Sequence, residues 1–289
     1  MTVARAAGLI LTLAGLALGT FVDRPREREI PRVGNQFVLQ GDFHVHAFLG
    51  DGGVAPWELA REARRRDLDV IVISNHNQQI AARIAADPER HRPGDPIVIA
   101  GQEVTAPRFH MVAAGIHETI DWRLSASEAI RATHAQGGVA IAAHPTEGSW
   151  RDPDENAFAL LDGVERTHPG AIGSARARRE LAEFFAHAAA RNPSLAPIGS
   201  SDFHFGAMLG ACRTYVFADE PSERGVLDAI RAGRTVAYGG EGQLFGDPAR
   251  VRAVEDLIAR HPPPPRAEPA SRLASWICLA GLLVLLLFR

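Results

Sequence analysis

The chain has 289 residues, of which 46% are hydrophobic and 22% are charged, values typical of an ordinary globular protein. These values exclude a disordered or fibrous chain, and the length fits one large domain. The net charge is −3 and every basic residue is Arg, which excludes a strongly basic nucleic-acid binder, a Schiff-base lysine and a P-loop lysine.

The first 22 residues are predicted to form an apolar targeting or anchoring segment. Uncharged residues run from Ala6 to Val22, directly behind Arg5. This pattern is typical of a signal peptide or a signal-anchor helix. Small residues at Ala17 and Gly19 form a weak cleavage motif, so that removal and retention of the segment both stay open. A linker over residues 23–34 follows.

Two features bear on the side of the membrane that the domain occupies. Four arginines after the first segment favour a cytoplasmic domain by charge, namely Arg24, Arg26, Arg28 and Arg32. Long domains, however, are translocated largely regardless of that bias, and the segment itself is similar to an export signal. We therefore expect an extracytoplasmic, periplasmic domain.

Between residues 35 and 246, short apolar runs alternate with Ala- and Arg-rich stretches, which predicts alternating strands and helices in one domain. The expected strands are 37–39, 70–73, 97–100, 111–114, 139–142, 163–165, 196–198, 215–217 and 235–237. The expected helices are 56–66, 125–136, 174–191 and 222–232. Helix starts are marked by Pro56, by Ser125 with Glu128 in a capping box, and by Ser222. The alternation favours a parallel sheet or barrel.

The C-terminal part is predicted to be a linker followed by a second apolar helix. The linker, residues 247–271, is expected to be partly helical. It contains the proline run Pro262–Pro265, and such a run is typical of a semi-rigid spacer. Uncharged residues from Leu273 to Phe288, between two arginines, are nearly long enough to cross a bilayer. We expect a transmembrane helix over 272–289. A buried core helix is the alternative for either terminal segment.

Side chains of the kinds that bind metals follow the predicted strands. Because parallel α/β folds place their sites beyond the carboxyl ends of strands, we expect these residues to converge. The nine candidates are His44, His46, Asp51, His76, Glu103, His110, His144, Asp202 and His204.

Spacing and neighbours support this set of candidates. In a strand, residues i and i+2 point to one face, so His44 and His46 can chelate one cation. The second such pair is Asp202 and His204. Glu103 follows an apolar strand, where an isolated charge is costly to bury unless cations surround it. His144 precedes a proline and is therefore expected to be extended.

Other catalytic chemistries fit the sequence less well. Ser200 and Ser201 lie near histidines, but the chain has no G-x-S-x-G nucleophile elbow. Cys212 has no obvious paired base and is expected to be a small buried residue. A dinucleotide-binding G-x-G-x-x-G does not follow any predicted strand.

Five motifs in this order resemble those of the PHP (polymerase and histidinol phosphatase) domain family. They are Asp42–His46 with Asp51, Ser74–Asn77, Gly101–Glu103, Ala143–Pro145 and Gly199–His204. The resemblance implies a distorted, TIM-like (β/α) barrel of seven strands, flanked here by the apolar terminal segments. It also implies a trinuclear metal centre at the C-terminal mouth of the barrel and hydrolysis of phosphoesters.

The resemblance further implies how the nine candidates divide among the metals. The first metal takes His44, His46, Glu103 and Asp202. The second shares Glu103 and adds His110 and His144. The third takes Asp51, His76 and His204. The chain departs from the family at Asn75, where Asp is usual, and at Gly50, where Ser often stands.

We therefore expect a metal-dependent phosphoesterase that acts on a small phosphorylated molecule and uses two or three divalent ions, of Zn, Mn or Fe. The residues expected to carry catalysis are His44, His46, Glu103, Asp202 and His204. Arg166, His168 and Arg213 are the candidates for substrate binding. Two alternatives stay open: hydrolysis of an amide, carbamate or carboxylic ester, and a membrane-anchored metal-binding module without turnover.

Overall fold

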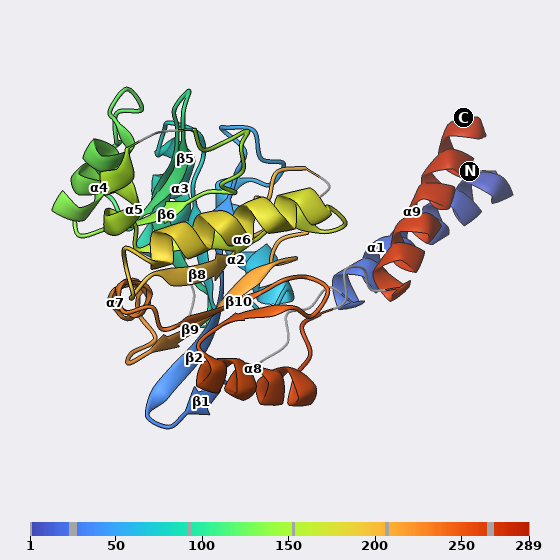
Figure 1. The fold of residues 1–289 in the computed structure, drawn as a ribbon. Coiled ribbons are helices and arrows are strands. Elements are labelled where there is room, and N and C mark those ends of the chain that lie inside the picture. The colour runs from blue at the N-terminus through green and yellow to red at the C-terminus, as the bar shows by residue number, and fades with distance from the viewer. Residues whose placement is uncertain are drawn as a thin grey trace. The chain divides into compact units, whose positions relative to one another are not determined.

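The computed structural model of this protein describes residues 2–22, 28–91, 94–151, 154–205, 208–264 and 269–288. The chain divides into two compact units (Figure 1). Residues 28–262 form the larger unit, and the two terminal segments, 1–27 and 263–289, form the smaller one. The linkers that we expect over 23–34 and 247–271 lie partly outside the described residues.

The larger unit is built on one mixed sheet, in the order β11-β10-β9-β2-β3-β4-β5-β6-β7-β8, with β1 paired to β2. The strands are β1 (Arg32–Val33), β2 (Gln36–Val45), β3 (Val70–Ile73), β4 (Ile97–Thr105), β5 (His110–Ala114), β6 (Val139–Ala142), β7 (Gly163–Thr167), β8 (Ala196–Gly199), β9 (Arg213–Ala218), β10 (Thr235–Tyr238) and β11 (Leu244–Gly246).

The sheet curls into a nearly closed barrel. Its last strand, β8, returns to β9 and β10 and is held there by side-chain hydrogen bonds. The Thr214 hydroxyl accepts from the Gly199 backbone N–H at 2.9 Å, and the Thr235 hydroxyl donates to the Pro197 carbonyl at 2.9 Å. The expected barrel-like α/β fold is therefore confirmed.

The barrel is not wholly parallel, which the expected alternation of strands and helices did not show. Strands β2–β3–β4 and β6–β7–β8 are parallel, but β5 pairs antiparallel with both β4 and β6. Strand β9 also pairs antiparallel with β2 and β10. The connection from β4 to β5 is short and contains no helix. So short a connection permits only antiparallel pairing of these two strands.

Helices cover the outside of this sheet (Figure 1). They are α2 (Pro56–Arg65), α3 (Ile80–Ala85), α4 (Ala126–Ala135), α5 (Glu155–Leu160), α6 (Ala175–Ala189), α7 (Glu223–Arg231) and α8 (Pro248–Arg260), with single 3₁₀ turns at Pro88–Arg90 and Pro169–Ala171. The predicted capping box forms at α4, where Ser125 and Glu128 cap each other. Helix α8 buries Val254 and Leu257 in the core, so the unit extends past the expected boundary at residue 246.

The core lies on both faces of the sheet. Strand β3 has four consecutive buried residues, Val70 to Ile73, as expected for a parallel strand that is covered on both sides. Val70 and Val72 contribute to one apolar cluster, and Ile71 and Ile73 to another. Two strands run further than their apolar stretches predicted, because polar residues continue them: β2 includes His44, and β4 includes Glu103.

The smaller unit consists of two helices, α1 (Val3–Val22) and α9 (Pro269–Leu287). Both contain a stretch long and apolar enough to cross a membrane, 20 residues in α1 and 18 in α9. Glycines allow them to lie close together. A Cβ atom on Gly15 would come within 2.7 Å of the Cys278 Cβ, and one on Gly8 within 3.1 Å of the Gly281 carbonyl.

Candidate metal centre

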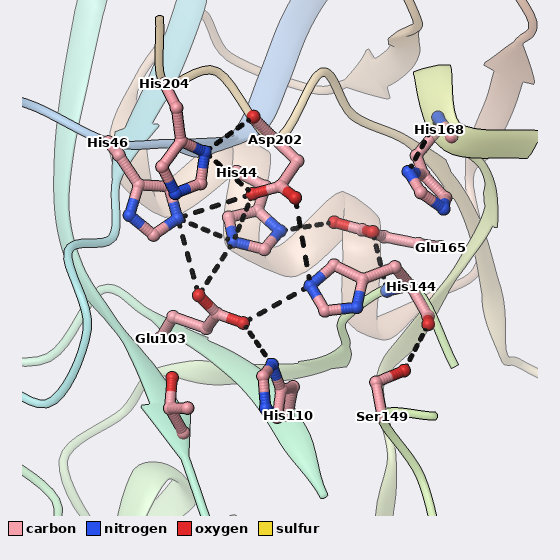
Figure 2. A network of polar contacts seen from close by, with 12 residues as sticks. His44, His46, Glu103, His110, His144, Ser149, Glu165, His168, Asp202 and His204 are labelled. Atoms are coloured by element: carbon pink, nitrogen blue, oxygen red, sulfur yellow. Dashed lines mark hydrogen bonds and ion pairs between the residues drawn. The ribbon is translucent and has the colours of Figure 1, made fainter. Parts of the chain in front are cut away.

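The structure brings the nine candidate ligands together at one end of the barrel. His44 lies in β2 and His46 directly after it, Glu103 lies in β4, and His110 opens β5. The other five lie on the loops that follow strand ends. Figure 2 shows most of these side chains pointing toward one another. We refer to all nine, His44, His46, Asp51, His76, Glu103, His110, His144, Asp202 and His204, as the imidazole–carboxylate cluster.

The first group within the cluster is the tightest. His44 Nε2 and His46 Nε2 are 3.0 Å apart. Glu103 Oε2 lies 3.3 Å from His44 Nε2 and 3.4 Å from His46 Nε2. Asp202 Oδ1 lies at the same two distances from these nitrogens. Four potential ligand atoms from three parts of the chain therefore face one point.

These spacings fit a shared cation. Ligand atoms bonded to one ion at about 2.1 Å, with angles between 90° and 109°, lie about 3.0–3.4 Å apart. Within the described part of the chain, the buried oxygens Glu103 Oε2 and Asp202 Oδ1 have no hydrogen bond of good geometry. Buried carboxylate oxygens normally have a partner. A divalent ion at this point would satisfy both of them.

Two further groups adjoin the first. Glu103 Oε1 lies 2.9 Å from His110 Nδ1 and 3.3 Å from His144 Nε2. Asp51 Oδ2 lies 3.1 Å from both His76 Nε2 and His204 Nε2. In each group the ligand atoms lie within 4.8 Å of one another.

Charge inside the cluster is balanced between imidazoles and carboxylates. Burial opposes ionisation of Glu103, but the imidazoles of His44, His110 and His144 hold the pKa of Glu103 well below its usual value. Burial also opposes a charge on His44, yet Asp202, Glu103 and Glu165 raise its pKa. The lowered pKa of Glu103 favours its ionised form, which is the form that binds cations.

Two cluster residues have an unusual backbone conformation. His144 has φ = +31° and Asp202 has φ = +48°, in the left-handed region that residues other than glycine rarely adopt. The expectation that His144 is extended is therefore wrong. The proline after it disfavours the right-handed helical region, and the turn that aims its imidazole at Glu103 uses the left-handed region instead. Such conformations are concentrated at functional sites.

Glu165, on β7, contacts two of the candidate ligands and was not among the residues predicted from the sequence. Its side chain is fully buried, and Oε1 accepts a hydrogen bond from His44 Nδ1 at 2.9 Å. Its Oε2 accepts from the backbone N–H of His144 at 2.7 Å. Holding Nδ1 in this way leaves His44 Nε2 facing the cluster. Glu165 lies in the short strand sequence Gly-Val-Glu-Arg-Thr, so it lacks the apolar run that precedes Glu103 and that made Glu103 a candidate.

The two departures from the family pattern, Asn75 and Gly50, lie against each other in the structure. The Asn75 Oδ1 accepts from the Ala47 N–H at 2.8 Å, and its Nδ2 donates to the Ala47 carbonyl at 2.9 Å. An aspartate could not make the second bond. A Cβ atom on Gly50 would overlap the Asn75 side chain. Both departures from the family pattern therefore support the loop that carries Asp51.

The three candidates for substrate binding lie in different surroundings. The His168 ring lies 5.7 Å from the His144 ring, at the border of the cluster, and burial lowers its pKa. Arg166 points to the opposite face of β7 from Glu165 and lies over the Phe245 ring at 4.1 Å. Arg213 is buried and donates to Gly210, Gln40 and Arg66. The structure therefore does not bring the two arginines to the cluster.

An open hollow of about 430 Å³ borders the cluster. Its lining includes His110, Asn77, Thr105 and Trp122. Thr105 also contacts the cluster, because its hydroxyl lies 2.6 Å from His76 Nδ1. A small molecule can approach the imidazoles from this hollow. Cys212, by contrast, is buried and its pKa is raised to about 11 by burial, so its thiol is neutral and unsuited to nucleophilic attack.

Comparison with known sequences connects the chain to one family. A model described as PHP-associated matches residues 181–235. The uncharacterized protein MJ1587 of Methanocaldococcus jannaschii is 27% identical over an alignment of 139 residues that covers 44% of this chain and 80% of that protein.

Two crystal structures are similar to the fold. A two-domain protein from Bacteroides vulgatus, described as containing a predicted PHP-like metal-dependent phosphoesterase, has a TM-score of 0.62 at 23% identity over 81% of this chain and 74% of that one. PsfC from Pseudomonas syringae has a TM-score of 0.51 at 16% identity, over 77% of this chain and 98% of its own. The resemblance to the PHP family, first indicated by the five motifs, is therefore confirmed.

Proposed function

We propose, on the premise that the chain is a PHP-type protein, that it is a metal-dependent hydrolase of phosphate esters. The observation that carries this proposal is the convergence of nine ligand-type side chains in four overlapping groups. Imidazole and carboxylate ligands suit Zn, Mn or Fe, and groups that overlap in this way suit two or three ions. The finer assignment is the one that the family resemblance implies: His44, His46, Glu103 and Asp202 for the first ion; Glu103, His110 and His144 for the second; Asp51, His76 and His204 for the third.

When bound, such ions supply a water of lowered pKa and positive charge for the oxygens of a phosphate. The chain's own residues hold and orient this chemistry. Glu103 presents Oε2 to the first group and Oε1 to the second, so one carboxylate fixes the spacing of both. The carbonyl of Asp202 lies 2.9 Å from His204 Nδ1, which turns His204 Nε2 toward Asp51.

The substrate is proposed to be a small phosphorylated molecule that approaches through the hollow beside His110. His168 remains the proposed substrate-binding residue, because it lies beside His144 and its burial favours the neutral imidazole. Because His168 Nδ1 accepts from the Gly170 N–H at 3.2 Å, the neutral ring carries its proton on Nε2 and can donate a hydrogen bond to a phosphate oxygen. Arg166 and Arg213 do not enter this proposal, since their guanidinium groups have other partners.

The proposed location is at a membrane. Both α1 and α9 have the length and composition of membrane-spanning helices. We propose that α9 anchors the chain and that α1 is either a second anchor or an export signal. The domain is proposed to lie on the extracytoplasmic side, because the first segment has the pattern of an export signal.

Metal analysis together with turnover tests the proposed function. We expect the purified full chain to contain divalent ions and to hydrolyse p-nitrophenyl phosphate or its diester. His44→Ala and Asp202→Ala should each lower kcat/KM by about 100-fold or more. The matched control is His134→Ala. The His134 ring is hydrogen-bonded to the Asp162 carboxylate at 2.7 Å, and both residues lie outside the cluster.

The same assay separates the alternatives. Faster turnover of p-nitrophenyl acetate, a carbamate or an anilide would assign the metal centre to carbonyl substrates. Bound ions without turnover of any ester would indicate a metal-binding module. Protein without ions after incubation with Zn, Mn and Fe, or full activity in both alanine variants, would contradict the proposal itself.

A further inference from the structure

Large apolar side chains are exposed at the border of the cluster. Among the described residues of 28–262, the large hydrophobic side chains with high exposure are Phe48, Leu49, Trp57, Ile80, Trp122 and Phe205. Three of them lie on the loops that carry Asp51 and His204, and Ile80 begins helix α3 directly after the loop that carries His76. We refer to these four, Phe48, Leu49, Ile80 and Phe205, as the apolar rim; they are 55%, 45%, 61% and 73% exposed.

Contacts between the three loops place the rim residues at one corner of the site. The Gly53 N–H donates to the His204 carbonyl at 3.0 Å, and the Phe205 ring occupies the space above Gly53. The Gln78 side chain donates to the Leu49 carbonyl at 3.0 Å. The same Gln78 side chain accepts from the Ile80 N–H at 2.7 Å. These contacts hold the three segments that carry the rim residues next to one another.

The rim residues are apolar, exposed and close in sequence to candidate metal ligands. Single exposed hydrophobic residues are normal on a soluble protein, but a cluster of them indicates a surface that binds something apolar. Phe48 and Leu49 stand within three residues of Asp51, Ile80 within four of His76, and Phe205 directly follows His204. An apolar group bound there lies beside the reacting centre.

A lipid is the occupant that the rest of the chain favours. Both termini carry helices of membrane-spanning length and composition. Five residues separate Val22 from Arg28, and at about 3.5 Å each they span less than about 25 Å. A hydrolase unit on so short a tether works close to any bilayer that holds α1. Aromatic side chains such as Phe48 and Phe205 suit the boundary between water and hydrocarbon.

We propose that the apolar rim binds the hydrocarbon chain of an amphiphilic phosphate ester, so that the substrate class is a lipid phosphate held in a membrane. This inference rests on the proposed function. Water adds to phosphorus, the bond from phosphorus to the ester oxygen breaks, and the lipid alcohol leaves with one proton of the water. The rim holds the lipid part while the imidazole–carboxylate cluster holds the phosphate.

The test compares two esters with the same head group. The full chain, loaded with metal and held in nonionic micelles, is assayed with dioleoyl phosphatidic acid and with glycerol 1-phosphate. The measured quantity is the ratio of kcat/KM for the lipid to kcat/KM for the soluble ester. A triple variant, Phe48→Ser, Leu49→Ser and Phe205→Ser, should lower this ratio by about tenfold or more, because it removes the apolar contact. The matched variant, Phe48→Leu, Leu49→Phe and Phe205→Leu, keeps the rim apolar and should keep the ratio.

A second measurement reports contact with lipid without turnover. Phe205→Trp is introduced into a Trp276→Phe background, which removes the tryptophan of α9. In vesicles that contain dibromo-phosphatidylcholine, we expect the Phe205→Trp protein to show bromine quenching beyond that of the background protein. Equal quenching in the two proteins would overturn the inference.

Each remaining outcome has one meaning. Hydrolysis of glycerol 1-phosphate with an unchanged ratio in the serine variant overturns the lipid substrate and leaves the proposed function standing. Hydrolysis of neither these two esters nor the p-nitrophenyl phosphates, with ions bound, overturns both. If the serine variant converts a dimer into a monomer by light scattering, the rim is an interface between copies and the inference is wrong.

Discussion

Glu165 connects two candidate ligands, His44 in strand β2 and His144 in the loop after β6. One oxygen holds the ring of His44, and the other holds the backbone of His144 in its left-handed turn. Burial opposes ionisation of Glu165, but His44 and His144 lower its pKa. The carboxylate is therefore charged and accepts from two donors at once.

Replacing Glu165 with Gln should weaken metal binding without removing a ligand. A glutamine offers one acceptor and one donor, so its amide NH₂ must face either the His44 Nδ1–H or the His144 N–H. One of the two ligands is then displaced or changes tautomer. Loss of such an outer partner lowers metal affinity by about 10–100-fold. Competition against a chromogenic chelator measures the change.

Asp162→Asn is the matched control for this variant. Asp162 also accepts from a histidine, His134, at 2.7 Å and from a backbone N–H, that of Ala140, at 2.8 Å. It lies outside the imidazole–carboxylate cluster, so its loss should leave metal affinity unchanged. Equal affinities in the wild type and the Glu165→Gln variant would show that Glu165 does not position His44.

The sequence was informative about individual candidate ligands because most of them stand at or shortly after the end of an apolar run. His44 and His46, for example, share the i, i+2 spacing that strand geometry turns into a shared face. It was not informative about Glu165, because one glutamate in a strand has no pattern of its own. Arg166 and Arg213 were expected at the substrate site, but their side chains have other partners. A position near a strand end does not show which face of the strand a side chain occupies.

At the scale of elements, the starts of two helices were predictable from the sequence. The short helices α3 and α5 and the C-terminal helix α8 were not. Ser125 and Ser222 cap α4 and α7 as their positions suggested. Helices α3 and α5 have only six residues each, too few to show a helical period. Helix α8 stands next to the proline run, and the prediction of a linker there overlooked that Val254 and Leu257 share one face.

Helices α1 and α9 allow a direct test of their packing. A Cβ atom on Gly19 would lie 3.7 Å from the Ala274 Cβ, within the range that a disulfide requires. In a background with Cys212→Ala and Cys278→Ala, the pair Gly19→Cys and Ala274→Cys should therefore form an intramolecular disulfide on mild oxidation of membranes. Mass spectrometry of the uncleaved chain detects it.

The control for this pair is Ala17→Cys with Ala274→Cys. Ala17 is exposed and lies about 200° around the helix from Gly19, so its thiol points away from α9. No disulfide is expected there. A cross-link in both proteins, or in neither, would contradict the packing, and a mature chain that begins after Val22 would show that α1 is removed as an export signal.

At the scale of the whole molecule, the sheet was predictable as a barrel of strands and helices, but its mixed directions were not. Whether two strands pair parallel or antiparallel depends on the connection between them, and the return of β8 to β9 and β10 depends on contacts between residues far apart in sequence. The five motifs predicted the barrel, because a resemblance to a family carries long-range topology that local patterns lack, but they did not predict the antiparallel strands. The same long-range closure gathers the cluster from both halves of the sheet.

Because the cluster draws on β2, β4, β5 and four loops, ion binding should stabilise the whole unit of residues 28–262. A ligand that binds only the folded state at 100 times its Kd adds about 2.7 kcal/mol. For a unit of this size, each kcal/mol changes Tm by about 2–4 °C. Removing one such ion with a chelator should therefore lower Tm by about 5–10 °C, and returning the ion should restore it.

The His44→Ala, Asp202→Ala double variant should show little of this drop, since it lacks half of the first group. An unchanged Tm in wild-type protein whose ions have been removed, as verified by metal analysis, would mean that ions do not connect these strands, because a cation shared between residues so distant in sequence must leave when the unit unfolds.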